Sequence, residues 1–168
     1  MLASYFIHMA NYNIWANRKL YSACKALGEE TIQKECPSYF GSIHKTLNHI
    51  LLGDMIWMAR FLGEENAPTK LDQLLHDNFA DLTDARFAFD EKILDFSISL
   101  TEERLSEAFQ YTDIAGSPHA MPFSICVGHM FNHQTHHRGQ VHGLLIQEME
   151  EPPALDLVYF TLEQLEGN

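Results

Sequence analysis

The sequence predicts an all-α protein built as a four-helix bundle, and three observations lead to this fold class. Four long segments place apolar residues at alternating steps of three and four, the spacing of a packed helix face. A glycine or proline follows three of these segments, at Gly28, Gly63 and Pro152. With 168 residues and a hydrophobic fraction of 46%, the chain is long enough to bury one core but not two. We therefore expect a single domain, residues 1–168, with short connections and one longer crossover.

The first two helices are predicted over residues 3–27 and 42–62. The first carries a seam of inward-facing positions at Ile7, Ala10, Ile14, Asn17, Tyr21 and Cys24. The second is apolar around most of its circumference, as a deeply buried helix is. A third helix is predicted over residues 71–100, where leucine, isoleucine and phenylalanine recur at helical spacing.

The pattern changes between residues 109 and 122, where short alternation surrounds Gly116-Ser117-Pro118. This pattern indicates a small β-hairpin or an irregular insert before the fourth long helix. That helix is expected over residues 122–149, with Pro122 in its first turn. A short last helix is expected over residues 154–165.

Charge and composition exclude several classes of function. Eleven basic and 23 acidic residues give a formal net charge of −12, which disfavours both a nucleic-acid backbone and an anionic membrane as partner. No run is apolar enough to span a bilayer, and the N-terminus lacks the basic start of a signal peptide. The three cysteines are odd in number and widely spaced, as reduced thiols of a cytoplasmic protein are.

The main candidate site lies in the stretch GHMFNHQTHHRGQVHG, Gly128 to Gly143, which holds five of the ten histidines. His133 and His137 are four residues apart on the fourth helix, so their imidazoles project about 40° apart and about 6 Å along the axis. Two imidazoles in this relation can chelate one cation. His129 lies one turn before them, and Gln140 follows His137 by nearly one turn.

A third ligand has to come from another helix, and the second helix offers His44 and His49. His44 lies nearer the expected exposed start of that helix, whereas His49 is flanked by Leu47, Ile50 and Leu51 and is expected to be buried. We therefore select His49. Three histidines leave a coordination position open, which is typical of catalytic rather than structural sites. Neutral imidazoles suit Zn, Ni, Fe or Cu. The chain has neither an HExxH zincin motif nor the Glu-x-x-His pairs of di-iron bundles.

Several further residues have two interpretations each. Gln140 could hydrogen-bond the outer nitrogen of a ligand or a metal-bound water. His129 could be an extra ligand, but it is expected to support a ligand from behind or to line the pocket. Arg138 is expected to form a surface ion pair. Asp54 falls on the apolar stripe of the second helix, where it could pair with Asn17 or support a histidine ligand, and a structural polar contact is expected. Cys126 is expected to be a packed thiol.

The order of motifs along the chain resembles the DinB-like family of metal-dependent enzymes, also called damage-inducible DinB proteins. The motifs are Tyr-x-x-Trp-Ala-Asn at residues 12–17, Leu-Asn-His-Ile at 47–50, Asn-His-x-x-His-His-Arg-Gly-Gln at 132–140 and Pro-Pro-Ala-Leu-Asp at 152–156. The resemblance covers essentially the whole chain. It implies an up-down-down-up four-helix bundle, often dimeric. It also implies a divalent metal, most commonly nickel or zinc with iron or manganese as alternatives, held at positions that here are His49, His133 and His137.

The expected function follows from the resemblance and the open site together. The wider superfamily includes thiol-dependent transferases and a maleylpyruvate isomerase, so we expect a metal-dependent S-transferase or hydrolase that acts on a small molecule with a low-molecular-weight thiol. One alternative is a stress-associated metal-binding or interaction protein without catalysis. Another is a bundle whose histidines are purely structural and bind no metal.

Overall fold

The computed structural model describes residues 1–65, 68, 70, 71 and 73–166, and over these the protein is mostly helical with one small two-stranded sheet. Residue 72, which falls in the helix expected over residues 71–100, lies outside the described residues. In chain order the elements are α1 (Leu2–Leu27), α2 (Glu29–Gln33), α3 (Ile43–Leu62), α4 (Phe79–Ser99), α5 (Glu102–Ser106), β1 (Ala108–Thr112), β2 (Pro118–Pro122), α6 (Phe123–Leu145) and α7 (Leu157–Glu166).

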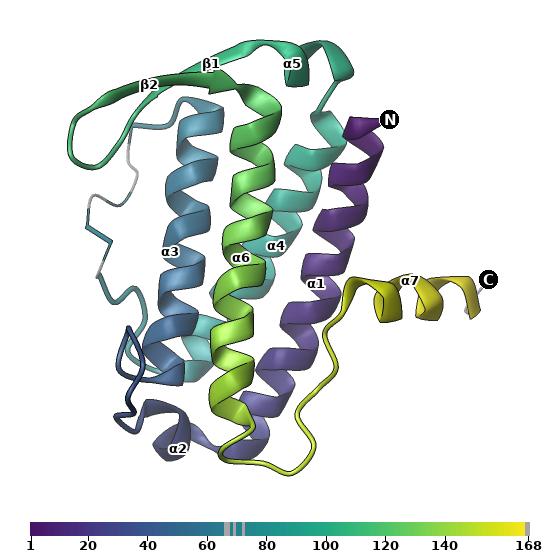
Figure 1. The fold of residues 1–168 in the computed structure, drawn as a ribbon. Coiled ribbons are helices and arrows are strands. Elements are labelled where there is room, and N and C mark those ends of the chain that lie inside the picture. The colour runs from purple at the N-terminus through teal and green to yellow at the C-terminus, as the bar shows by residue number, and fades with distance from the viewer. Residues whose placement is uncertain (66–67, 69, 72, 167–168) are drawn as a thin grey trace.

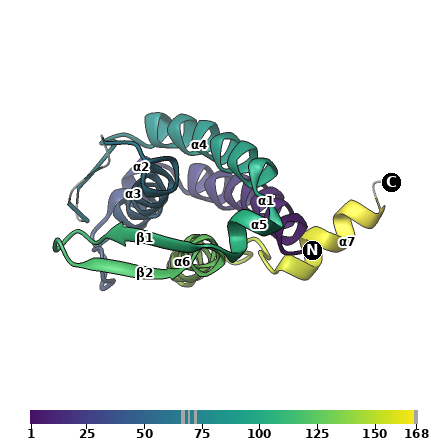
Figure 2. The ribbon, with the colours of Figure 1, turned by 90° about the horizontal axis from the view of Figure 1, so that it is seen from above.

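The four long helices lie side by side, while α7 extends away from them (Figure 1). Helix α1 packs against α4 and α6, and α3 packs against α6 and α4. Seen from above, the β1–β2 hairpin crosses one end of α3 and α6 (Figure 2). In Figure 1, α1 and α6 run downward and α3 and α4 run upward. Because α3 and α4 are parallel, the chain between them has to return along the length of a helix.

Local sequence explains where the long helices begin and end. The Ser42 side chain accepts a hydrogen bond from the Lys45 backbone N–H at the start of α3, and Asn78 does the same for Asp81 at the start of α4. Helix α3 ends at Gly63, whose φ of 68° is a left-handed conformation that glycine adopts without a steric penalty. These caps satisfy backbone groups that a helix end would otherwise leave without partners.

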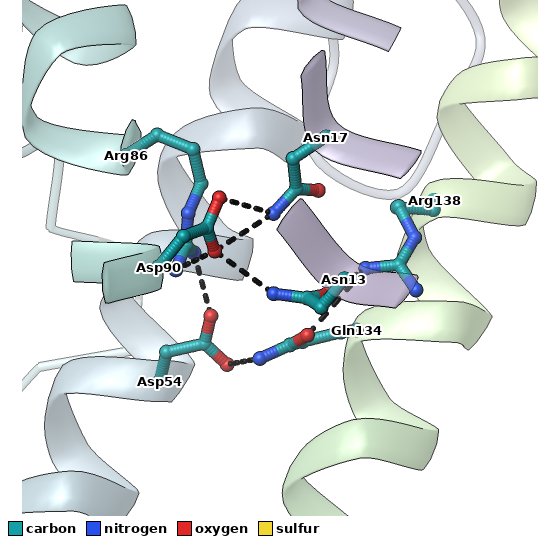
Figure 3. Close-up of polar contacts among 7 residues, drawn as sticks. All are labelled: Asn13, Asn17, Asp54, Arg86, Asp90, Gln134 and Arg138. Atoms are coloured by element: carbon teal, nitrogen blue, oxygen red, sulfur yellow. Dashed lines mark hydrogen bonds and ion pairs between the residues drawn. The ribbon is translucent and has the colours of Figure 1, made fainter. Parts of the chain in front are cut away.

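The core consists of two apolar clusters separated by a polar layer. One cluster lies toward the hairpin and includes Phe61, Phe96 and Phe123, whose rings pack within 6.4 Å of one another. The other surrounds Leu47 and Leu82 at the opposite ends of the helices. Between them lie seven buried polar side chains from all four long helices (Figure 3): Asn13, Asn17, Asp54, Arg86, Asp90, Gln134 and Arg138.

Most predicted elements agree with the structure, and the hairpin is the correct one of the two alternatives for the insert. Its strands are antiparallel, with Tyr111 opposite His119. The third helix is the clearest error at this level, since α4 begins at Phe79 and not at residue 71. The short helices α2 and α5 were not predicted, and α7 begins at Leu157 rather than at residue 154. Among the described residues, no helix combines the length and apolar character needed to cross a bilayer.

Two expectations about the burial of polar residues are wrong, and one about a polar contact is right except for the partner. Arg138 is not on the surface, because it is only 2% exposed. Asp54 does make a structural contact, but its partners are Arg86 at 2.6 Å and Gln134 at 2.8 Å, while Asn17 donates to Asp90. His44 is the buried histidine of α3 and bonds the His76 carbonyl, whereas His49 is only partly buried.

Candidate metal centre

Three histidine side chains converge where α3 packs against α6. His133 and His137 lie one turn apart on α6 with ring centroids 4.3 Å apart, and His49 of α3 lies 4.6 Å from His137 and 5.2 Å from His133. One ring nitrogen from each lies within 4.8 Å of the others. Nitrogens that share a tetrahedral metal at about 2.0–2.1 Å are roughly 3.4 Å apart. Small rotations of the three rings would therefore bring them to ligand distance.

The position of His133 depends on Gly53, which lies one turn after His49 on α3. A Cβ atom at residue 53 would lie 2.6 Å from Cε1 of the His133 ring, far inside van der Waals contact. The glycine therefore lets the imidazole of α6 lie directly against the backbone of α3. Glycine in a helix interior is unfavourable by about 1 kcal/mol relative to alanine, so its presence in this buried helix is explained by the close approach.

Hydrogen bonds set the tautomers of two of the rings. The Leu71 carbonyl accepts a hydrogen bond from Nδ1 of His49 at 3.2 Å, and Oε1 of Gln140 accepts one from Nδ1 of His137 at 2.8 Å. The Gln140 amide nitrogen lies 3.2 Å from Nε2 of His136, which is consistent with this amide orientation. A proton on Nδ1 leaves the Nε2 lone pair available, which is the form in which histidine binds a metal.

The third ring has no such partner. Nδ1 of His133 is buried and forms no hydrogen bond with any residue that the structure describes. A buried ring nitrogen without a partner is uncommon, and a bound cation would satisfy it. The chemistry of this donor set therefore fits a divalent metal.

Burial also keeps the three imidazoles neutral. Loss of solvent, together with the smaller effect of the neighbouring histidines, lowers the pKa of His133 to about 3. The pKa values of His49 and His137 are lowered as well, again mainly by burial. Metal binding requires neutral imidazole, so at neutral pH no proton has to leave these rings first.

A cavity of about 710 Å³ opens beside the three histidines. Phe40 stacks on the His49 ring at 4.1 Å, and Lys45, Asn48 and Leu74 also line the space. A volume of this size is in the range of small-molecule sites. A smaller cavity of about 220 Å³ lies next to it and is closed partly by Asp113 and Ile114 of the hairpin turn.

The two residues expected near the ligands differ in their contacts. Gln140 directly bonds His137, as described above. His129 lines the smaller cavity, where its ring lies 5.0 Å from Trp57 and 6.0 Å from His133. Burial and the nearby Arg60 charge lower the pKa of His129. Sequence reasoning did not identify Phe40 or Gly53, although a glycine inside so apolar a helix was an available signal.

Fold and site together define a helical protein with a cluster of three histidines suited to a divalent cation. The DinB family model matches residues 1–166, and the chain belongs to the DinB family. The chain is 28% identical to Protein DinB of Bacillus subtilis (strain 168) over 156 residues, which cover 87% of each chain.

Proposed function

We propose that this protein binds a divalent metal through His49, His133 and His137 and leaves at least one coordination position open. The observation that carries this proposal is the convergence of three ring nitrogens from two helices within 4.8 Å. The family resemblance favours zinc or nickel, with iron or manganese as alternatives, while neutral imidazoles by themselves suit Zn, Ni, Fe or Cu. We assign Gln140 to orienting His137 and His129 to the wall beside His133.

The open position and the adjoining cavity support an enzyme that acts on a small molecule. A bound metal would lower the pKa of a thiol or water and so supply a nucleophile at neutral pH. The protein's own part is to hold the three rings, to present Phe40 and Leu74 as apolar walls, and to limit the access of water. Within this class we propose a thiol-dependent S-transferase or a hydrolase that uses a low-molecular-weight thiol as partner.

The same proposal covers the wider organisation of the protein. The packing of α1, α3, α4 and α6 supports an up-down-down-up four-helix bundle, and the family match from residue 1 to residue 166 supports a single domain over residues 1–168.

Cys24, Cys36 and Cys126 are free thiols, which supports a cytoplasmic location. We also propose a homodimer that has neither nucleic acid nor membrane as a partner.

Elemental analysis of tag-free protein, purified without chelating resin, tests the metal site. We expect about one metal ion per chain in the wild type and its loss in His137→Ala. His142→Ala is the matched control, since His142 is on the same helix but does not line the histidine cavity, and it should retain the metal. Absence of metal from the folded wild type, even after addition of zinc or nickel, would overturn the proposal.

Cobalt substitution then tests whether the site is open. An open cobalt site should change its absorption spectrum when a small thiol is added, because the thiolate becomes a ligand. A broad screen of electrophilic acceptors with bacillithiol, mycothiol or glutathione should then show metal-dependent turnover. A cobalt spectrum that no thiol changes would instead support a metal-binding protein without catalysis.

A further inference from the structure

A second cavity, of about 600 Å³, lies between α1, α6 and the segment that leads into α7. It shares no lining residue with the histidine cavity. Its walls are mainly apolar and include Met9, Leu155 and Leu157. The Tyr12 hydroxyl donates to the Leu155 carbonyl at 2.7 Å and so holds the C-terminal segment over this space.

The lining also contains polar residues, among them Thr135, His142 and Arg138, and the side chain of Arg138 is almost completely buried. Its Nη1 donates to Asn13 and, at 3.4 Å, to Gln134, and its Nη2 donates to Thr135, also at 3.4 Å. Bonds of 3.4 Å are long for N–H···O. Its Nε has no hydrogen-bond partner among the described residues.

Arg138 also differs from Arg86 in its electrostatic partners. Arg86 forms ion pairs with both Asp54 and Asp90, at 2.6 and 2.8 Å. No carboxylate of the described residues lies within ion-pair distance of Arg138, which contacts only neutral oxygens. Figure 3 shows one terminal nitrogen of Arg138 directed at Asn13 and the other directed away from the remaining six residues. A buried guanidinium is stabilised most by a carboxylate that it can bind directly.

We propose that this second cavity binds a small monocarboxylate with an apolar body. The carboxylate would accept hydrogen bonds from the Arg138 guanidinium in place of its long bond to Thr135, and the apolar body would lie against Met9 and Leu157. A single carboxylate fits better than a multiply charged anion for two reasons. Only one guanidinium is present, and the exposed Asp156 on the rim repels added negative charge. This site is independent of the metal centre.

Matched probes test the ligand class on the full-length protein. Phenylacetate and phenylacetamide have the same shape but differ in charge, as do octanoate and octanamide. Because a hydrogen bond to a charged group contributes about 1.5–3 kcal/mol, each acid should bind at least about tenfold more tightly than its amide. Isothermal titration calorimetry measures both affinities. Equal binding of acid and amide, or binding of neither, would overturn the proposal.

Two glycines of α6 provide a blocking variant and its control. A Cβ at Gly139 or at Gly143 meets no atom within 4 Å, so a side chain can begin at both of these exposed positions without a clash at its first atom. Only Gly139 lines the cavity. Gly139→Leu should therefore weaken binding of the acids about tenfold or more, while Gly143→Leu leaves it unchanged. Undiminished binding in Gly139→Leu would place the ligand elsewhere and overturn the assignment. Equal metal content in both variants would show that the effect is separate from the histidine site.

Discussion

The position of the His133 ring depends on the absence of a side chain at residue 53. Gly53→Ala would put a methyl group 2.6 Å from Cε1 of His133 and so displace the ring. We expect the variant to lose about 10- to 100-fold in metal affinity, the range seen when groups that orient ligands are changed. The helix itself should not suffer, because alanine is favoured over glycine in helix interiors by about 1 kcal/mol. Competition with a chelator measures the affinity, and circular dichroism measures the fold.

Gly128→Ala is the control for this substitution. Gly128 lies on α6, one residue before His129, and a Cβ there meets nothing within 4 Å. It should bind metal as the wild type does. If Gly53→Ala binds metal with the affinity of the wild type, the prediction is wrong, because the His133 ring can then reach the metal from another position.

Gln140 gives a second prediction at the residue scale. Gln140→Ala removes the acceptor that holds Nδ1 of His137. The ring can then rotate, so that the lone pair of its Nε2 no longer points toward the metal. We expect metal affinity to fall about 10- to 100-fold, with little change in stability because the side chain is partly exposed. Gln147→Ala is the control, since the Gln147 side chain donates to the Gly143 carbonyl and does not line the histidine cavity. The same loss in both variants would contradict a specific role for Gln140.

At this scale, sequence reasoning succeeded where helix periodicity alone was enough. The spacing of His133 and His137 places both rings on one face of a helix, and the structure brings them to His49 as expected. That these residues bind a metal stays a prediction. Exposure was harder to predict, because it depends on other segments. His44 is buried by the chain around His76, and Arg138 is buried by contacts with α1, which lies more than a hundred residues earlier in the sequence.

At the scale of elements, the buried polar layer joins all four long helices and should make stability depend on pH. Burial raises the pKa of Asp54 from 3.8 to about 6, against the opposing charge of Arg86. The folded state therefore binds a proton between about pH 4 and pH 6 that the unfolded state releases. Stability from this group is fully present below about pH 4 and is lost as pH rises through about 6, by on the order of 3 kcal/mol.

Urea denaturation of metal-free protein from pH 4 to pH 7 tests this sign. We subtract the unfolding free energy of Asp54→Asn from that of the wild type. This difference should fall as the pH rises, because asparagine does not titrate. Asp77→Asn is the control for the loss of a carboxylate at an exposed position. A difference for Asp54→Asn that rises with pH would mean that Arg86 outweighs burial and that the carboxyl pKa is lowered.

Element boundaries were predictable where capping residues mark them. Gly28 and Gly63 follow α1 and α3, and Pro122 directly precedes α6. The start of α4 was placed too early because Leu74 and Leu75 continue the apolar spacing. The cap of that helix is Asn78, and Asn48 of α3 accepts hydrogen bonds from the backbone N–H groups of Leu75 and His76. That contact holds the segment as a loop, and a pattern within one segment cannot reveal it.

At the scale of the whole molecule, the apolar patterns predict how many long helices there are but not how they are ordered. Each long helix has a broad buried face, so several pairings would bury similar apolar area. The parallel pairing of α3 with α4 was expected from the family resemblance and not from the residues. The layer in Figure 3 supplies the missing specificity, because its charges and amides match one another across particular helices.

A metal at the proposed site should stabilise the whole fold, because its ligands would come from two helices that are far apart in sequence. A ligand that binds only the folded state adds about 2.7 kcal/mol at a hundredfold excess over its Kd. For a domain of this size, that corresponds to a rise in Tm of roughly 5–10 °C. Calorimetry of chelator-stripped protein with increasing zinc or nickel should show this rise in the wild type and in His142→Ala, but not in His137→Ala. An equal rise in His137→Ala would show that the metal binds folded protein at another place, since His49 and His133 alone would form a much weaker site.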